Sequence, residues 1–120
     1  MSKILLVDDD TDMLAMTGRW LEKAGYEVTK AESGAQALTL AAAEKPDLIL
    51  LDVYMPEMDG PETLKKLKET PETANIPVLF RTGMEDTDLE EACSPYRAEG
   101  FVPKSEGKPT LMNAVAAALS

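Results

Sequence analysis

Residues 48–52 read Leu-Ile-Leu-Leu-Asp, four large apolar side chains followed by a carboxylate. A continuous apolar run of this length is typical of a strand that is buried on both faces of a sheet. We expect this strand to cover Asp47–Val53. Ile4–Val7 has the same form and is followed by Asp8 and Asp9. Two such strands, separated by helix-forming sequence, predict a parallel sheet with helices on both faces.

The rest of the chain alternates in the same way between apolar runs and segments of helical periodicity. Strands are expected over Ile4–Val7, Tyr26–Thr29, Asp47–Val53, Pro77–Thr82 and Phe101–Val102, and helices over Asp12–Ala24, Ser33–Glu44, Asp59–Glu69, Asp86–Cys93 and Pro109–Leu119. The sequence therefore predicts an α/β fold in which a strand–helix unit occurs five times. No linker, repeat or block of charge divides the 120 residues, so we expect one domain over residues 1–120.

Three local signals support the expected helix boundaries. Gly25 follows the first helix and can adopt the left-handed conformation that ends a helix. Ser33 with Gln36 three residues later forms the pattern of a capping box. Asp59 with Glu62 marks a further helix start.

The composition excludes several classes of function. The net charge is −10, with 12 basic and 22 acidic residues, which argues against direct binding of nucleic acid or an anionic membrane. The chain has no histidine, so His-ligated zinc and a Ser-His-Asp triad are excluded. It has one cysteine and no apolar stretch long enough for a signal peptide or a membrane helix. We therefore expect a cytoplasmic protein.

Polar side chains stand at the ends of four of the five expected strands. They are Asp8–Asp10 after the first strand, Asp52 at the third, Thr82 at the fourth and Lys104 after the fifth. Chemistry in open parallel sheets gathers beyond the carboxyl ends of the strands, so these residues are expected to lie together. Clustered carboxylates repel one another, and Mg²⁺ with its preference for oxygen ligands relieves that repulsion. A metal, a carboxylate nucleophile and hydrogen-bond donors are the components of phosphoryl transfer.

Each of these residues also has a plainer interpretation. Asp10 is equally compatible with a helix cap and with a role in the acidic cluster. Thr82 alone is an ordinary strand-end residue, and Lys104 alone is an ordinary surface lysine. Asp52 is harder to explain in this way, because a buried strand rarely ends in a charge without a partner.

Taken together, these residues resemble the receiver domain of bacterial two-component response regulators, over essentially the whole chain. The motifs that carry the resemblance are Ile4–Asp9, Leu50–Gly60, Pro77–Gly83 and Gly100–Lys104. The resemblance implies a flavodoxin-like sheet with strand order 2-1-3-4-5. It also implies that Asp52 accepts a phosphoryl group from a histidine kinase or phosphotransfer protein. Mg²⁺ would then be held by Asp8, Asp9, Asp52 and the backbone carbonyl of Tyr54.

The resemblance also implies a switch. Lys104 would contact the phosphoryl oxygens, Thr82 would hydrogen-bond to them, and Phe101 would turn inward as Thr82 moves. A downstream protein would bind the face formed by the fourth helix, the fifth strand and the fifth helix. The module would catalyse only its own phosphorylation and dephosphorylation.

The chain departs from the family pattern after its lysine, where Ser105 stands in place of a proline. This leaves the path of the following loop open, and Lys108, which does precede a proline, is a weaker candidate for the same role. Tyr54 and Met84 are bulky residues at the positions that flank the route of the hydrolytic water in the family, so slow self-dephosphorylation is expected.

Arg81 stands where a buried strand favours an apolar residue. Its simplest interpretation is a side chain that emerges at the end of the sheet, where a nearby carboxylate can pair with it.

Two other functions are compatible with parts of this pattern. A degenerate receiver would bind partners without being phosphorylated, and the altered loop after Lys104 is its only support. A haloacid-dehalogenase-like phosphatase also uses an aspartate nucleophile with Mg²⁺, but it requires a second aspartate where this chain has Tyr54.

Overall fold

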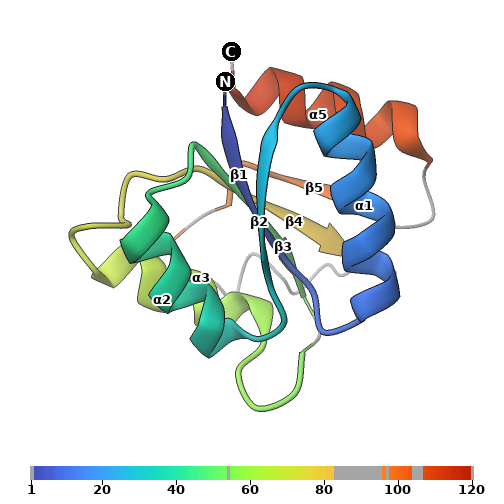
Figure 1. The fold of residues 1–120 in the computed structure, drawn as a ribbon. Coiled ribbons are helices and arrows are strands. Elements are labelled where there is room, and N and C mark those ends of the chain that lie inside the picture. Colours follow the sequence, from blue (N-terminus) through green and yellow to red (C-terminus); the bar gives the residue numbers. More distant parts are fainter. Residues whose placement is uncertain (1, 54, 83–95, 97, 104–106, 120) are drawn as a thin grey trace.

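A five-stranded sheet forms the centre of the molecule in the computed structural model, which describes residues 2–53, 55–82, 96, 98–103 and 107–119 (Figure 1). The strands are β1 (Lys3–Val7), β2 (Glu27–Ala31), β3 (Leu48–Asp52), β4 (Val78–Thr82) and β5 (Gly100–Pro103). All neighbouring strands run parallel, in the order β2-β1-β3-β4-β5. The predicted fold class and strand order are confirmed.

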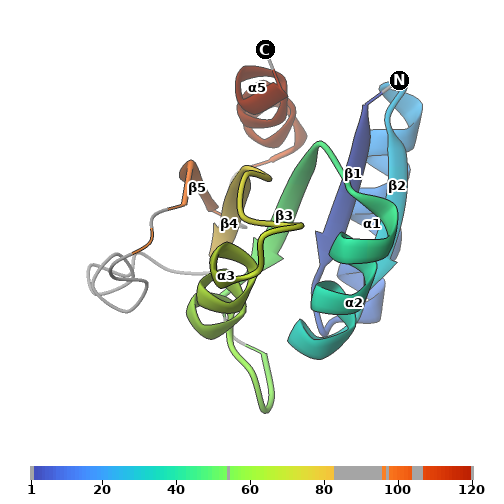
Figure 2. The ribbon, with the colours of Figure 1, turned by 90° about the vertical axis from the view of Figure 1, so that its left-hand side faces the viewer.

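Helices cover both faces of this sheet. They are α1 (Thr11–Lys23), α2 (Gly34–Glu44), α3 (Gly60–Glu69) and α5 (Lys108–Leu119). Figures 1 and 2 show α2 and α3 on one face, and α1 and α5 on the other. The helix predicted over Asp86–Cys93 lies outside the described residues. No helix in the described part of the chain is long and apolar enough to cross a membrane.

Most of the predicted boundaries agree with the structure to within one or two residues. The largest shift is in β2, which was expected over Tyr26–Thr29 and instead covers Glu27–Ala31. The reason is its pairing with β1, which runs in register from Lys3 opposite Glu27 to Val7 opposite Ala31. Strand pairing therefore extends β2 beyond its own apolar signal.

Side chains at the helix starts satisfy backbone N–H groups, as the sequence predicts. Ser33 caps α2, its hydroxyl accepting from the backbone N–H of Gln36 at 3.1 Å. The side chain of Gln36 accepts from the N–H of Glu32 at 2.7 Å, one residue earlier than in a standard capping box. Asp59 caps α3 by accepting from the N–H of Glu62 at 2.9 Å. Gly25 has the predicted left-handed conformation, with φ of 100°.

The buried side chains form two apolar clusters, one on each face of the sheet. The cluster beneath α2 and α3 contains, among others, Leu5, Val7, Ile49, Leu51, Phe80, Leu64 and Leu67. The cluster beneath α1 and α5 contains, among others, Ile4, Leu6, Leu48, Leu50, Leu79, Leu14, Leu21, Leu111 and Val115. Successive residues of one strand alternate between the two clusters, as the pleat of a strand requires.

Gly60 fixes the packing of α3 against the end of β3. A Cβ atom at this position would lie 2.5 Å from the backbone oxygen of Asp52 and 2.8 Å from Cε1 of Phe80. The backbone N–H of Gly60 also donates to the carbonyl of Val53 at 2.8 Å. The absence of a side chain at Gly60 therefore lets α3 begin directly against the strand that carries Asp52.

Candidate functional site

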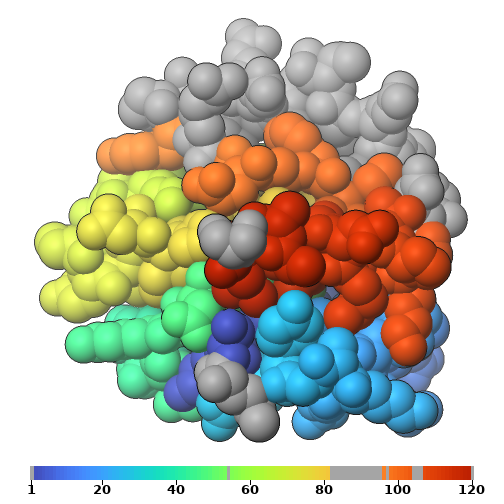
Figure 3. Space-filling model, turned by 90° about the horizontal axis from the view of Figure 1, so that it is seen from above, coloured from blue at the N-terminus to red at the C-terminus, as the bar shows by residue number. Residues whose placement is uncertain are grey.

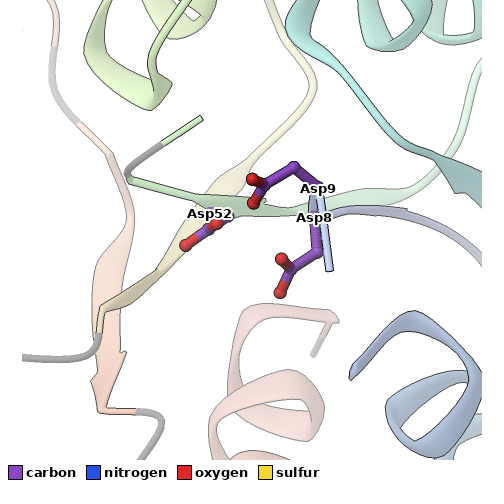
Figure 4. Close-up of side chains that lie close together, drawn as sticks. All are labelled: Asp8, Asp9 and Asp52. Carbon is purple, nitrogen blue, oxygen red and sulfur yellow. The ribbon is translucent and has the colours of Figure 1, made fainter. Parts of the chain in front are cut away.

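Three carboxylates converge at the carboxyl end of the sheet. Asp8 and Asp9 directly follow β1, and Asp52 is the last residue of β3 (Figure 4). Each offers an oxygen, and these oxygens lie within 4.8 Å of one another. Asp8 and Asp52 are only 2% and 5% exposed, whereas Asp9 is exposed. The structure thus brings together the three aspartates that the sequence singled out as metal ligands.

Backbone hydrogen bonds hold this edge of the sheet in place. The N–H of Asp8 donates to the carbonyl of Ala31 at 3.1 Å, which continues the pairing of β1 with β2. The carboxylate of Asp8 accepts from the N–H of Asp10 at 3.0 Å. Asp10 in turn caps α1, accepting from the N–H groups of Asp12 and Met13 at 3.0 and 3.2 Å. Of the two interpretations of Asp10, the structure supports the helix cap.

The donor set of this cluster suits a hard divalent cation. Three carboxylates so close together repel one another strongly, because each like-charged pair at about 4 Å costs roughly 4 kcal/mol at an effective dielectric constant of 20. Mg²⁺ prefers oxygen ligands and is commonly bound by one or two carboxylates together with water. Asp8, Asp9 and Asp52 therefore fit Mg²⁺. The fourth expected ligand, the carbonyl of Tyr54, lies outside the described residues.

Arg81 corrects one expectation from the sequence. Its side chain does not emerge at the end of the sheet, since the residue is only 3% exposed. The Nη1 atom donates to the hydroxyl of Thr17 in α1 at 2.8 Å, and Thr17 is fully buried. Burial lowers the pKa of Arg81, while the charges of Asp8 and Asp52 act in the opposite direction. The nearby carboxylates therefore act on a guanidinium that is buried inside the protein rather than on one at the surface.

The other residues expected at the site are described only in part. Thr82 ends β4, and only its backbone is described. Lys104 and Met84 lie outside the described residues. Phe101 lies in β5, is 43% exposed, and stacks on Phe80 with ring centroids 6.0 Å apart and planes at 10°. The structure therefore shows Phe101 in an outward position.

The fold and the acidic cluster agree with a comparison against known protein families. Residues 4–116 match the model of the response regulator receiver domain. The chain belongs to this family, which is the receiver domain of two-component systems, a signalling domain rather than a classical enzyme. Receiver domains bind Mg²⁺ at an acidic pocket, and they interact with histidine kinases or phosphotransfer proteins and with downstream effectors.

Relatives of different lengths share this domain. The protein PilH of Pseudomonas aeruginosa is 35% identical over 100% of this chain and 99% of its own length. The transcriptional regulatory protein PhoP of Bacillus subtilis, which regulates alkaline phosphatase synthesis, is 36% identical, but the match covers 85% of this chain and only 44% of PhoP. The structure is similar to that of the chemotaxis protein CheY4 of Vibrio cholerae, with a TM-score of 0.93, 31% identity and 99% coverage of both chains.

Proposed function

We propose that this chain is a phosphoacceptor that receives a phosphoryl group on Asp52 from a phosphohistidine of a histidine kinase or phosphotransfer protein. The observation that carries the proposal is the convergence of Asp8 and Asp9 on Asp52 at the carboxyl edge of a receiver-domain sheet. The donor histidine must lie outside these 120 residues, because they contain none.

The covalent step is a displacement at phosphorus. A carboxylate oxygen of Asp52 forms the new O–P bond while the P–N bond of the phosphohistidine breaks. The imidazole nitrogen leaves with the bonding electron pair and takes up a proton. Asp8, Asp9, Asp52 and the carbonyl of Tyr54 would hold Mg²⁺, which supplies positive charge opposite the oxygens of the transferred group.

Phosphorylation would add negative charge at the carboxyl edge of the sheet, and this change supports a switch. An aspartyl phosphate carries roughly −1.5 to −2 charges in place of the −1 of the free carboxylate, and it adds new acceptor oxygens, by analogy with other phosphorylated side chains. In the proposal, Lys104 and Thr82 donate to these oxygens and Phe101 leaves its outward position. Its present exposure of 43% is compatible with such a movement.

The described part of the proposed output face lies between β5 and α5. A pocket of about 300 Å³ is lined there by Leu79, Glu99, Gly100, Phe101, Val102, Ala114, Ala117 and Ala118. In Figure 3, α5 (red) lies on the surface between β5 (orange) and the blue segment where α1 passes into β2. Since Phe101 lines this pocket, its movement would change the surface offered to a downstream protein.

The proposal is tested by incubating the protein with acetyl phosphate and Mg²⁺ and measuring the intact mass. Wild type should gain the mass of one phosphoryl group, and Asp52→Asn should gain none. Asp47→Asn is the matched control, because Asp47 precedes the same strand at its opposite end and is exposed. It should be modified like wild type.

The same reaction distinguishes the alternatives. An unmodified wild type would favour a degenerate receiver. Modification of Asp52→Asn would mean that a residue other than Asp52 accepts the phosphoryl group. After removal of acetyl phosphate, the time course tests the expected slow self-dephosphorylation attributed to Tyr54 and Met84. Loss of the phosphoryl group within seconds would contradict it.

A further inference from the structure

One face of the sheet changes from apolar to charged at its carboxyl end. The side chains that point toward α1 and α5 are every second residue of each strand. In β1 the series is Ile4, Leu6 and then Asp8, in β3 it is Leu48, Leu50 and then Asp52, and in β4 it is Leu79 and then Arg81. The last member of each series is charged and buried, and one of the three is a cation.

Strand pairing places this cation beside the acids. Arg81 is the register partner of Asp52 between β3 and β4, and Asp8 directly follows β1, the other neighbour of β3. The negative charges of both aspartates act on the guanidinium. Buried carboxylates are costly unless a cation or hydrogen bonds compensate them. Arg81 supplies such compensation from within the fold.

A hydrogen bond to α1 helps to fix the position of the guanidinium. Its Nη1 donates to Thr17, which lies 64 residues earlier and is fully buried in α1. Its Nε is the one buried side-chain nitrogen or oxygen in the described ranges that has no hydrogen-bond partner. A buried Nε without a hydrogen-bond partner is unfavourable, and attraction to the nearby negative charges can offset that cost.

We propose that Arg81 is an internal counter-ion of the acidic pocket, which compensates Asp8 and Asp52 in the absence of metal and thereby weakens the binding of divalent cations. The proposal rests on the proposed function, because it concerns the same metal site. A guanidinium stays protonated under all ordinary conditions, so its charge opposes the metal throughout the physiological pH range. In this view Arg81 is a positioning residue, which acts through the carboxylates.

The test is calorimetric titration of the unphosphorylated protein with Mg²⁺. Arg81→Met and Arg81→Gln remove the charge, and Gln keeps an N–H donor near Thr17. For both we expect the Kd for Mg²⁺ to fall by about tenfold, since each removes one cation beside the ligands. Arg81→Lys retains the charge and should stay within about threefold of wild type. Arg19→Met is the matched control, because it removes an exposed arginine from α1 and should leave the Kd unchanged.

Arg81→Met and Arg81→Gln can also lower the free energy of unfolding, and the response of such a variant to Mg²⁺ then tests the proposal. If Arg81 and Mg²⁺ compensate the same carboxylates, Mg²⁺ should restore folding of Arg81→Met or Arg81→Gln, which circular dichroism would show. Failure of saturating Mg²⁺ to restore either variant would overturn the proposal. So would an unchanged Kd in folded neutral variants.

The outcomes separate this inference from the proposed function. If wild type binds Mg²⁺ and is phosphorylated while the neutral variants bind Mg²⁺ with the same Kd, only the role of Arg81 is wrong. If neither wild type nor the neutral variants bind Mg²⁺, the metal site and the role of Arg81 are both wrong. Binding that is detectable only in the neutral variants would support the inference most strongly.

Discussion

The side chains of the sheet that point toward α2 and α3 differ from those that point toward α1 and α5. Under α2 and α3, β4 buries Phe80 in an apolar cluster. On the opposite face the next residue, Arg81, is buried beside Asp8 and Asp52. Phe80 and Arg81 are 0% and 3% exposed, so adjacent residues of one strand are equally buried in environments of opposite character.

This difference shows that one face of the sheet contributes mainly stability, whereas the other also carries the charged residues of the acidic pocket. The α2/α3 face can be closed by apolar packing alone, whose free energy scales with buried apolar area. The α1/α5 face must also bury charges, and α1 contributes the hydroxyl of Thr17 to do so. Substitutions on the first face should therefore change the free energy of unfolding most, whereas those on the second should also change the behaviour of the acidic pocket.

The largest expected effect on stability is that of Phe80→Ala. The ring is fully buried, so the substitution leaves a cavity and should lower the free energy of unfolding by about 3–5 kcal/mol. Phe101→Ala is the control, because Phe101 stacks on Phe80 but is 43% exposed; it should cost about 0.5–1.5 kcal/mol. Urea denaturation measures both. Equal losses in the two variants would contradict the assignment of Phe80 to the stabilising face.

A smaller effect is expected from Thr17→Val, which removes the acceptor of the Arg81 guanidinium. Leaving a buried charged donor without this partner should cost about 1.5–3 kcal/mol in urea denaturation. Thr63→Val is the same change at a buried threonine of α3. Its hydroxyl donates to the carbonyl of Asp59, which also accepts from the backbone N–H of Thr63 at 2.9 Å.

The two threonine variants compare the faces directly. Because the Asp59 carbonyl keeps a donor, Thr63→Val should cost less than about 1 kcal/mol. A Thr17→Val variant as stable as Thr63→Val would mean that the hydrogen bond to Arg81 adds nothing to the fold.

The sequence predicts the sheet and the acidic cluster for the same reason. Continuous apolar runs identify β1 and β3 as buried parallel strands, and the carboxyl ends of parallel strands meet at one edge. Once Ile4–Val7 and Leu48–Leu51 are recognised as strands, the aspartates that follow them are placed at one edge of the sheet, and the strand order that makes β1 and β3 neighbours brings them together.

The environment of Arg81 could not be predicted in this way. Its burial depends on the register that pairs it with Asp52 and on a hydroxyl 64 residues away in α1. A charged residue near a strand end is usually exposed, so local pattern favours the wrong interpretation. The strand alternation from Leu79 does place Arg81 on the face of α1, and this was the one available signal.

Lys68 is a partly buried cation that can be compared with the buried Arg81. Its pKa is lowered by burial, with the charge of Glu99 acting in the opposite direction. The Nζ atom donates to the backbone carbonyls of Ala74 and Ile76 at 3.1 and 2.9 Å, and so ties α3 to the segment before β4. Lys68 therefore compensates carbonyl dipoles, whereas Arg81 faces carboxylates.

Lys68→Met should have a small effect on stability and none on Mg²⁺ binding. Loss of the two hydrogen bonds should lower the free energy of unfolding by about 1 kcal/mol, because the side chain is partly exposed and water can replace it at the carbonyls. The Kd for Mg²⁺ should stay the same as in wild type, since Lys68 lies outside the acidic pocket. If removing this cation tightened Mg²⁺ binding as much as removing Arg81, the effect of Arg81 would reflect net charge rather than its place beside Asp8 and Asp52.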